Sequence, residues 1–200
     1  LKYTMHGSDS LVAIEHRTMY YHSISGDSLF CLGYENPTTL ITYQKPELLL
    51  TFPILQNQKI SDYFDGEGRY CEHMYIRQRG KSIITADASG DLILPEGDTL
   101  HKVLRIHTHK QIHQSIILKD NVSALLKVDT LPYTLNCDSI EYLLTNDSIH
   151  QEIEIWRWYA YGYRYPVVET IKSTVYQYGK PYEHFSTSFI YLPEEQYYDL

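Results

Sequence analysis

The sequence predicts an all-β protein with little helix, built from antiparallel strands that pack as a β-sandwich or as two packed β lobes. Clusters of Gly, Pro, Asn, Asp and Ser, which form turns, recur roughly every 8–15 residues. The segments between them are rich in β-branched and aromatic residues, and none shows the 3.6-residue period of an amphipathic helix. Tyrosine, which favours strands, accounts for 20 of the 200 residues. Short strands at such spacing are typical of antiparallel sheets packed face to face.

Apolar and alternating segments in the N-terminal third predict five strands. They cover residues 11–14, 18–24, 29–34, 38–43 and 48–54. Turns at Gly26, Pro37 and Pro46 separate them, because Gly allows positive φ and Pro interrupts a ladder. The polar, Gly-containing segment 56–68 is predicted to be a loop. We expect a single domain over residues 1–200, with this loop as the one candidate boundary between sub-lobes.

The stretch 82–109, SIITADASGDLILPEGDTLHKVLRIHTH, predicts a three-stranded β-meander. Its predicted strands are 82–86, 92–94 and 100–109, and its predicted turns are 87–90 and 95–98. A further strand is expected at 70–79, where side-chain character alternates with a period of two.

The C-terminal part of the chain continues the β pattern. Segment 112–127 fits a short helix or two strands, and we favour two strands separated by a turn at 119–121. Turns at 129–132 and 136–139 flank a short strand. The remaining predicted strands are 133–135, 141–144, 149–165, 167–178 and 182–192.

Composition and charge exclude several classes of partner. The formal net charge is −8, the acidic residues are scattered, and no basic patch is present, so nucleic acid and anionic membrane surfaces are not expected partners. No apolar run reaches the roughly 18 residues of a transmembrane helix. No cofactor-binding motif is present, so we predict no cofactor. The chain begins at Leu1, and we expect a removed signal or a lipid-anchor linker upstream of residue 1.

The three cysteines leave the redox compartment open. Cys31, Cys71 and Cys137 lie far apart and form no C-x-x-C pair, so they lack the spacing of a zinc site. One disulfide with one free thiol fits the sequence as well as three buried thiols do.

His107 and His109 are the weak candidates for a metal site. On a strand, both side chains of an H-x-H pair point to the same face, roughly 6.6–6.8 Å apart. A metal needs three or four ligands, and no third ligand is evident nearby, while Arg105 and Lys110 add positive charge. We therefore predict no metal, and expect these histidines to lie on a solvated outer face.

The sequence contains no complete catalytic or calcium-binding motif. The segment 87–91, DASGD, resembles a fragment of a calcium loop, but the further ligands that such a loop requires do not follow. No nucleophile elbow, P-loop or dinucleotide motif is present. The carboxylate pairs Glu152/Glu154 and Glu194/Glu195 leave a glycoside hydrolase as the alternative function, since two carboxyls across a cleft could cleave a glycosidic bond.

The segment 156–165, WRWYAYGYRY, is the best candidate for ligand binding. On a strand, Trp156 and Trp158 share one face, and Tyr161 and Tyr163 share the other. Exposed aromatic rows bind sugar rings or anchor protein partners, whereas buried ones form the core between sheets. Both arrangements fit the sequence, and Gly162 is a candidate for a bulge. If the chain binds a ligand, we predict Trp156, Trp158, Tyr161 and Tyr163 as the contact residues.

Three segments carry a resemblance to a known group of proteins. Residues 26–54, 85–108 and 156–169 are similar to the patterns ADGxGxLxLPxGxxxNVLRV and W-Y-x-x-G-x-x-Y-P-L. These patterns resemble uncharacterised β-rich domains of secreted and surface proteins of Bacteroidetes, over roughly residues 26–172. The chain departs from them at His101 and Lys102. The resemblance implies export to the periplasm or cell surface, as a lipoprotein in some cases, and assigns no catalytic residue.

We therefore expect a non-enzymatic β-sandwich module that is secreted or located in the cell envelope. Its expected role is binding or structural interaction, with a glycan or an envelope protein as partner. The absence of a catalytic constellation favours a binding role over an enzymatic one.

Overall fold

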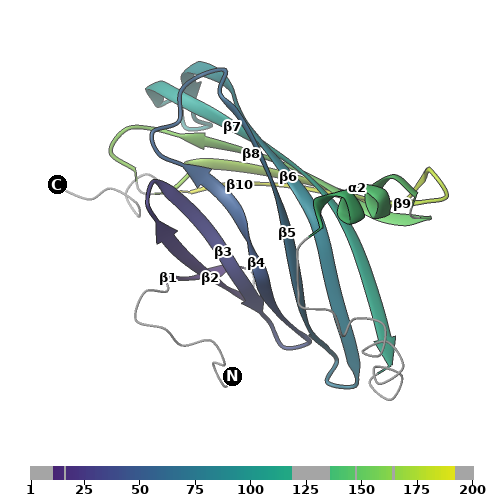
Figure 1. Ribbon diagram of the computed structural model, residues 1–200. Helices are drawn as coiled ribbons and strands as arrows, with labels where there is room; N and C mark the ends of the chain where they lie inside the picture. Colours follow the sequence, from purple (N-terminus) through teal and green to yellow (C-terminus); the bar gives the residue numbers. More distant parts are fainter. Residues whose placement is uncertain (1–10, 16, 119–135, 147, 164, 192–200) are drawn as a thin grey trace.

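The computed structural model describes residues 11–15, 17–118, 136–146, 148–163 and 165–191 (Figure 1). This part of the chain consists of strands and one helix, α2 (Cys137–Asn146). The strands are β1 (Leu11–Glu15), β2 (Thr18–Ser25), β3 (Ser28–Glu35), β4 (Thr39–Thr51), β5 (Lys59–Tyr70), β6 (Met74–Ile93), β7 (Thr99–Leu118), β8 (Ile149–Tyr159), β9 (Val168–Gln177) and β10 (Lys180–Ile190).

The strands form one ten-stranded sheet, in which each strand pairs antiparallel with the next one along the chain. The predicted all-β, antiparallel class is therefore confirmed. The two stacked sheets of a sandwich, and two separate lobes, are not confirmed, because the ladder runs from β1 to β10 without a break. Alternation in a sequence shows which residues face inward, but it does not show whether a second sheet or the same sheet covers them.

The sheet curls, so that its early strands face its middle strands (Figure 1). In a flat sheet β3 and β6 would lie three strand spacings apart, about 14 Å. Instead, the hydroxyl of Tyr34 on β3 donates to Oε1 of Gln78 on β6 at 3.3 Å. The hydroxyl of Ser82 on β6 donates to Glu47 on β4 at 3.0 Å. By curling, the sheet covers its own inner face.

The core lies on this inner face. Alternate residues of β6 are buried there, from Ile76 to Ala86, and we call the opposite side of the sheet the outer face. One apolar cluster consists of Cys31, Ile41, Tyr43, Phe64, Ile76 and Ile112, and a second of Leu48, Leu50, Ile84, Ala86 and Ile106. The ammonium of Lys110 on β7 forms an ion pair with the buried carboxylate of Glu47 on β4. This ion pair connects β4 with β7 across the inner face of the curled sheet.

The predicted three-stranded meander at 82–109 is wrong, because this stretch belongs to one long hairpin. β6 and β7 are 20 residues each, and the turn between them lies at 94–98. Residues 87–90, predicted as a turn, lie inside β6, where the register shifts twice. The carboxylate of Asp87 binds the Arg105 guanidinium on β7 at 2.8 and 3.0 Å, so its partner lies across the strands.

Other predicted turns and loops also belong to strands. Residues 59–68 of the predicted loop 56–68 belong to β5, which is hydrogen-bonded to β4 and to β6. The predicted strand 70–79 is interrupted by a turn at 71–73, where Cys71 and Glu72 have positive φ. Pro46 lies within β4, at a register shift that leaves it outside the ladder.

Helix α2 replaces a turn and a strand that the sequence predicted at 136–144. The side chain of Asn136 caps it by accepting hydrogen bonds from the backbone N–H groups of Asp138 and Ser139. Ile140 and Leu144, one turn apart, are buried, so the apolar face of the helix packs on the outer face of the sheet near β6 and β7. No helix in the described ranges is long and apolar enough to cross a membrane. The strands and turns predicted within 119–135 lie outside the described residues.

All three cysteines are free thiols. Cys31 is buried, Cys137 is partly buried and Cys71 is exposed. Burial raises the pKa of Cys31 to about 12, so this thiol stays protonated at neutral pH.

Candidate ligand-binding surface

The aromatic segment that the sequence singled out divides at the end of a strand. β8 ends at Tyr159, so the predicted strand 149–165 is too long. Trp156 and Trp158 lie on β8, whereas Tyr161 and Tyr163 lie in the connection to β9, where Gly162 has a φ of 86°. The alternation that was to place the two tyrosines on the opposite face therefore does not apply beyond Tyr159.

Trp156 projects from the outer face and is only partly buried. Its indole stacks on the imidazole of His107, which lies directly across from it on β7, with ring centroids 4.8 Å apart and an interplanar angle of 6°. On its other side, the residue across from it is Thr170 on β9. Because Thr170 is short, no bulky side chain of that row stands against this side of the indole.

Trp158 shares the outer face with Trp156, as predicted. The guanidinium of Arg105 lies 5.8 Å from the centroid of its ring. Trp158 and Tyr163 both pack against a small cluster formed by Val103, Ala160 and Val167. These contacts hold both rings in place while leaving them partly exposed.

Tyr161 is almost fully exposed, with 94% of its surface accessible. None of the four predicted residues is buried. We call Trp156, Trp158, Tyr161 and Tyr163 the aromatic surface. Trp158 and Tyr163 are brought together by packing, whereas Tyr161 lies in the turn between Ala160 and Tyr163 without a packing role in that cluster.

Hydrogen-bonding side chains lie beside the aromatic surface. Thr170 and Ser188, in the same row as Trp156, share a hydrogen bond of 2.9 Å and are on the exposed side. In the next row, Nζ of Lys172 lies 3.4 Å from Glu154. Thr170, Ser188 and Lys172 could not be identified from the sequence, because strand order and register, which no local pattern reveals, bring them next to Trp156.

His107 and His109 point to the outer face, as the H-x-H spacing predicted. They do not converge on a common ligand, because His107 lies 3.7 Å from Glu154 and His109 lies 3.6 Å from Glu152. Within the described residues, no three His, Cys, Asp or Glu side chains are arranged to hold a metal ion. Burial lowers the pKa of His107, and the carboxylate of Glu154 opposes this effect only in part.

The carboxylates that sequence patterns had raised as sites have other partners. Both oxygens of Asp87 bind Arg105, so this carboxylate has a cationic side chain as its partner. Glu152 lies within 3.8 Å of His150 and Glu154 within 3.4 Å of Lys172. The pair Glu194/Glu195 lies outside the described residues.

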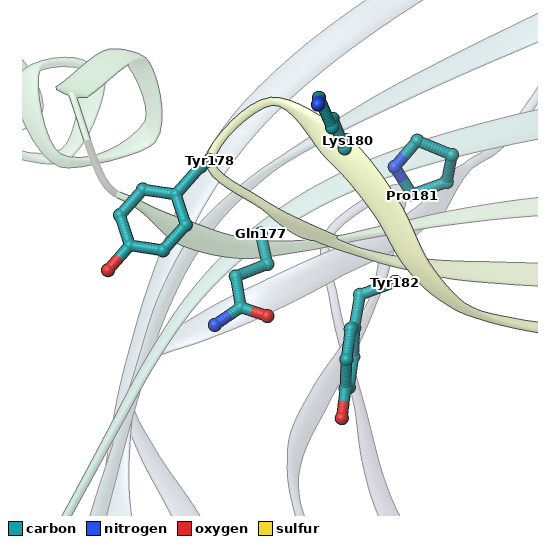
Figure 2. Close-up of a pocket in the computed structure, with 5 residues that line it drawn as sticks. All are labelled: Gln177, Tyr178, Lys180, Pro181 and Tyr182. Atoms are coloured by element: carbon teal, nitrogen blue, oxygen red, sulfur yellow. The ribbon is translucent and has the colours of Figure 1, made fainter.

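A pocket at the β9–β10 hairpin is a second candidate, which the sequence analysis missed (Figure 2). It is lined by Gln177, Tyr178, Lys180, Pro181 and Tyr182. The sequence predicted strands at 167–178 and 182–192, with a turn at 179–181 between them and no binding site. The signal that could have indicated more is a tyrosine directly before the turn glycine, where Asn or Asp is usual.

No protein-family model, no curated protein and no solved structure matches this chain. A functional proposal therefore depends on the arrangement of the described side chains.

Proposed function

We propose that the protein is a non-enzymatic module of the cell envelope that binds a glycan through the aromatic surface. The observation that carries this proposal is the pair Trp156 and Trp158. They project side by side from the outer face, neither is buried, and each ring is held by a cationic or imidazole neighbour on β7. Ordered aromatic rings that remain accessible provide contact area at low cost in side-chain entropy.

The chemistry around Trp156 favours a glycan over a protein partner. A pyranose presents a face of C–H groups, which packs on an aromatic ring, and a rim of hydroxyls, which requires hydrogen-bonding partners. Thr170, Ser188, Glu154 and Lys172 supply such partners within one or two rows of the sheet. A binding site of this kind combines an apolar base with a few polar groups that set orientation.

The alternative, a glycoside hydrolase, has less support. Such an enzyme needs two carboxyls on opposite sides of the scissile bond in a cleft. Glu152 and Glu154 project from the same face of one strand, and each lies close to a basic side chain. The pocket at the β9–β10 hairpin has no carboxylate among its lining residues.

The proposal includes a location in the periplasm or at the cell surface, with a lipid anchor upstream of residue 1. It is supported by the resemblance to β-rich domains of secreted and surface proteins that residues 26–54, 85–108 and 156–169 carry. Protease treatment of intact cells that produce the full-length gene product should degrade a surface protein. Release only after outer-membrane disruption would indicate the periplasm, and recovery solely with cytosolic markers would contradict export.

A glycan array probed with the purified protein tests the binding function. The strongest glycan is then titrated by calorimetry against wild type, Trp156→Ala and Tyr161→Ala. We expect at least tenfold weaker binding for Trp156→Ala and a smaller loss for Tyr161→Ala. Tyr142→Ala is the matched control, because Tyr142 is an exposed tyrosine on α2, away from the aromatic surface.

Thermal melting checks that each variant is folded. Equal affinity of wild type and Trp156→Ala, or no binding to any glycan, would contradict the proposed function. A protein partner captured through the same surface would replace the glycan, and glycan hydrolysis that depends on Glu152 or Glu154 would support the alternative.

A further inference from the structure

The pocket at the β9–β10 hairpin has a volume of about 410 Å³. This size lies in the range of roughly 300–1,000 Å³ of small-molecule sites. Figure 2 shows the carboxamide of Gln177 between the rings of Tyr178 and Tyr182. Both tyrosines are largely exposed, at 77% and 74%, so neither ring is used to stabilise the core.

Tyr178 occupies a backbone conformation that is unfavourable for its side chain. It and Gly179 form the two-residue connection between β9 and β10, with φ values of 50° and 72°. A connection of this type favours Asn or Asp followed by Gly, because bulky residues rarely adopt positive φ. The backbone N–H of Tyr178 donates to the carbonyl of Ser148 at 2.6 Å, which fixes the turn against the start of β8.

Tyr182 is placed by a second backbone irregularity. Pro181 pairs with Tyr176 and Glu183 pairs with Val175, so Tyr182 is the extra residue of a β-bulge. A bulge redirects the side chain of its extra residue, and bulges are frequent beside binding sites. Here the bulge places the Tyr182 ring in the same pocket as Tyr178.

We propose that this pocket is a binding site for a single pyranose unit. The two tyrosine rings are apolar surfaces, on either of which a face of the sugar ring can pack, and the carboxamide of Gln177 offers both a donor and an acceptor to its hydroxyls. A strained turn and a bulge that both direct an exposed tyrosine into one pocket are costly features with no role in the core. The inference is independent of the aromatic surface, with which the pocket shares no residue.

The test is a titration of the ¹⁵N-labelled protein with the methyl glycosides of glucose, galactose, mannose and N-acetylglucosamine, followed by amide NMR shifts. The amide of Gly179 reports on the pocket, and the amide of Gly162 reports on the aromatic surface. We expect saturable shifts of Gly179 with at least one sugar. Tyr182→Ala and Tyr178→Gly should weaken this binding tenfold or more, whereas Tyr142→Ala, at an exposed tyrosine of α2, should leave it unchanged.

Tyr178→Gly separates binding from stability. Glycine adopts positive φ without strain, so this variant should melt at or above the wild-type temperature while losing the sugar. No saturable shift of Gly179 with any of the four sugars, or equal affinity in Tyr182→Ala, would overturn the inference. Shifts confined to Gly162 would overturn it as well, and would leave the proposed function of the aromatic surface intact.

Discussion

The imidazole of His107 lies parallel to the indole of Trp156, with an interplanar angle of 6° and 4.8 Å between ring centroids. The stack joins β7 to β8 on the outer face and orients the indole that we propose as the main glycan contact. It also buries much of the imidazole, whose Nε2 has no hydrogen-bond partner. The neutral form of His107 is therefore favoured over the charged form.

Replacement of His107 by Phe should reduce the dependence of stability on pH. Burial lowers the pKa of His107 in the folded protein below its usual 6.5, although Glu154 and Asp87 act in the opposite direction. Below pH 6.5 the unfolded chain thus binds a proton that the folded chain binds more weakly, and stability falls as the pH decreases from 6.5 toward the folded pKa. Urea unfolding at about pH 7.5 and pH 5 measures the difference.

The expected result is a smaller loss of unfolding free energy between these two pH values in His107→Phe than in wild type. Adding His22→Gln to His107→Phe should reduce the loss of unfolding free energy further, because burial and the charge of Arg157 also lower the pKa of His22. The two histidines belong to separate contact groups, so their effects should add. Identical pH dependence in all three proteins would show that neither imidazole is disfavoured as a cation.

Sequence periodicity was sufficient for the two tryptophans of the aromatic surface, which lie on β8. Trp156 and Trp158 share a face because a strand repeats every two residues, whatever its neighbours are. The partners of these rings were not predictable in the same way. His107 and Arg105 stand beside them only because β7 pairs with β8 in one particular register, which is set by contacts distant in sequence.

The missed elements have local physical causes. Asp87 and Gly90 are turn-forming residues, but cross-strand pairing with Arg105 and two register shifts keep them within β6. Helix α2 is only ten residues long and buries two side chains, too few for a clear 3.6-residue period. Whether ten strands stack as two sheets or curl as one depends on contacts such as that of Tyr34 with Gln78.

Lys110→Met should strongly destabilise the fold. Lys110 is the ion-pair partner of Glu47, and both side chains are mostly buried. Removal of the ammonium leaves the buried carboxylate of Glu47 without its cationic partner and with the Ser82 hydroxyl as a neutral donor. The cost of breaking one side of a buried pair is about 3–5 kcal/mol, measurable by urea unfolding.

The double variant Glu47→Leu/Lys110→Met is the control for this interpretation. It removes both charges and replaces them with apolar groups, which is often neutral in a packed interior. We expect it to recover most of the stability lost in Lys110→Met. A double variant as unstable as the single one would indicate that packing, and not the unpaired charge, causes the loss.

Gly68→Ala should destabilise the pairing of β4 with β5. A Cβ at Gly68 would lie 1.7 Å from the carbonyl oxygen of Leu40, so the two backbones would have to separate. Overpacking of this kind costs about 1–3 kcal/mol, and more when backbone must move. Gly90→Ala is the matched control, since a Cβ there has no heavy atom within 4 Å. Equal melting temperatures of the two variants would contradict the close approach of β4 and β5.

Asn136→Ala should weaken the start of α2. The side-chain oxygen of Asn136 accepts hydrogen bonds from the backbone N–H groups of Asp138 at 3.0 Å and Ser139 at 3.4 Å. Loss of such a cap lowers the free energy of unfolding by about 1 kcal/mol. Asn136→Ser retains a capping oxygen and should remain close to wild type. Hydrogen exchange at the amides of α2 measures the effect locally. Glu141 on α2 binds Tyr63 on β5 and Lys81 on β6, so faster amide exchange in Asn136→Ala should extend to these two residues. Faster exchange confined to Asp138 and Ser139 would instead show that the contacts of Glu141 hold the helix without its cap.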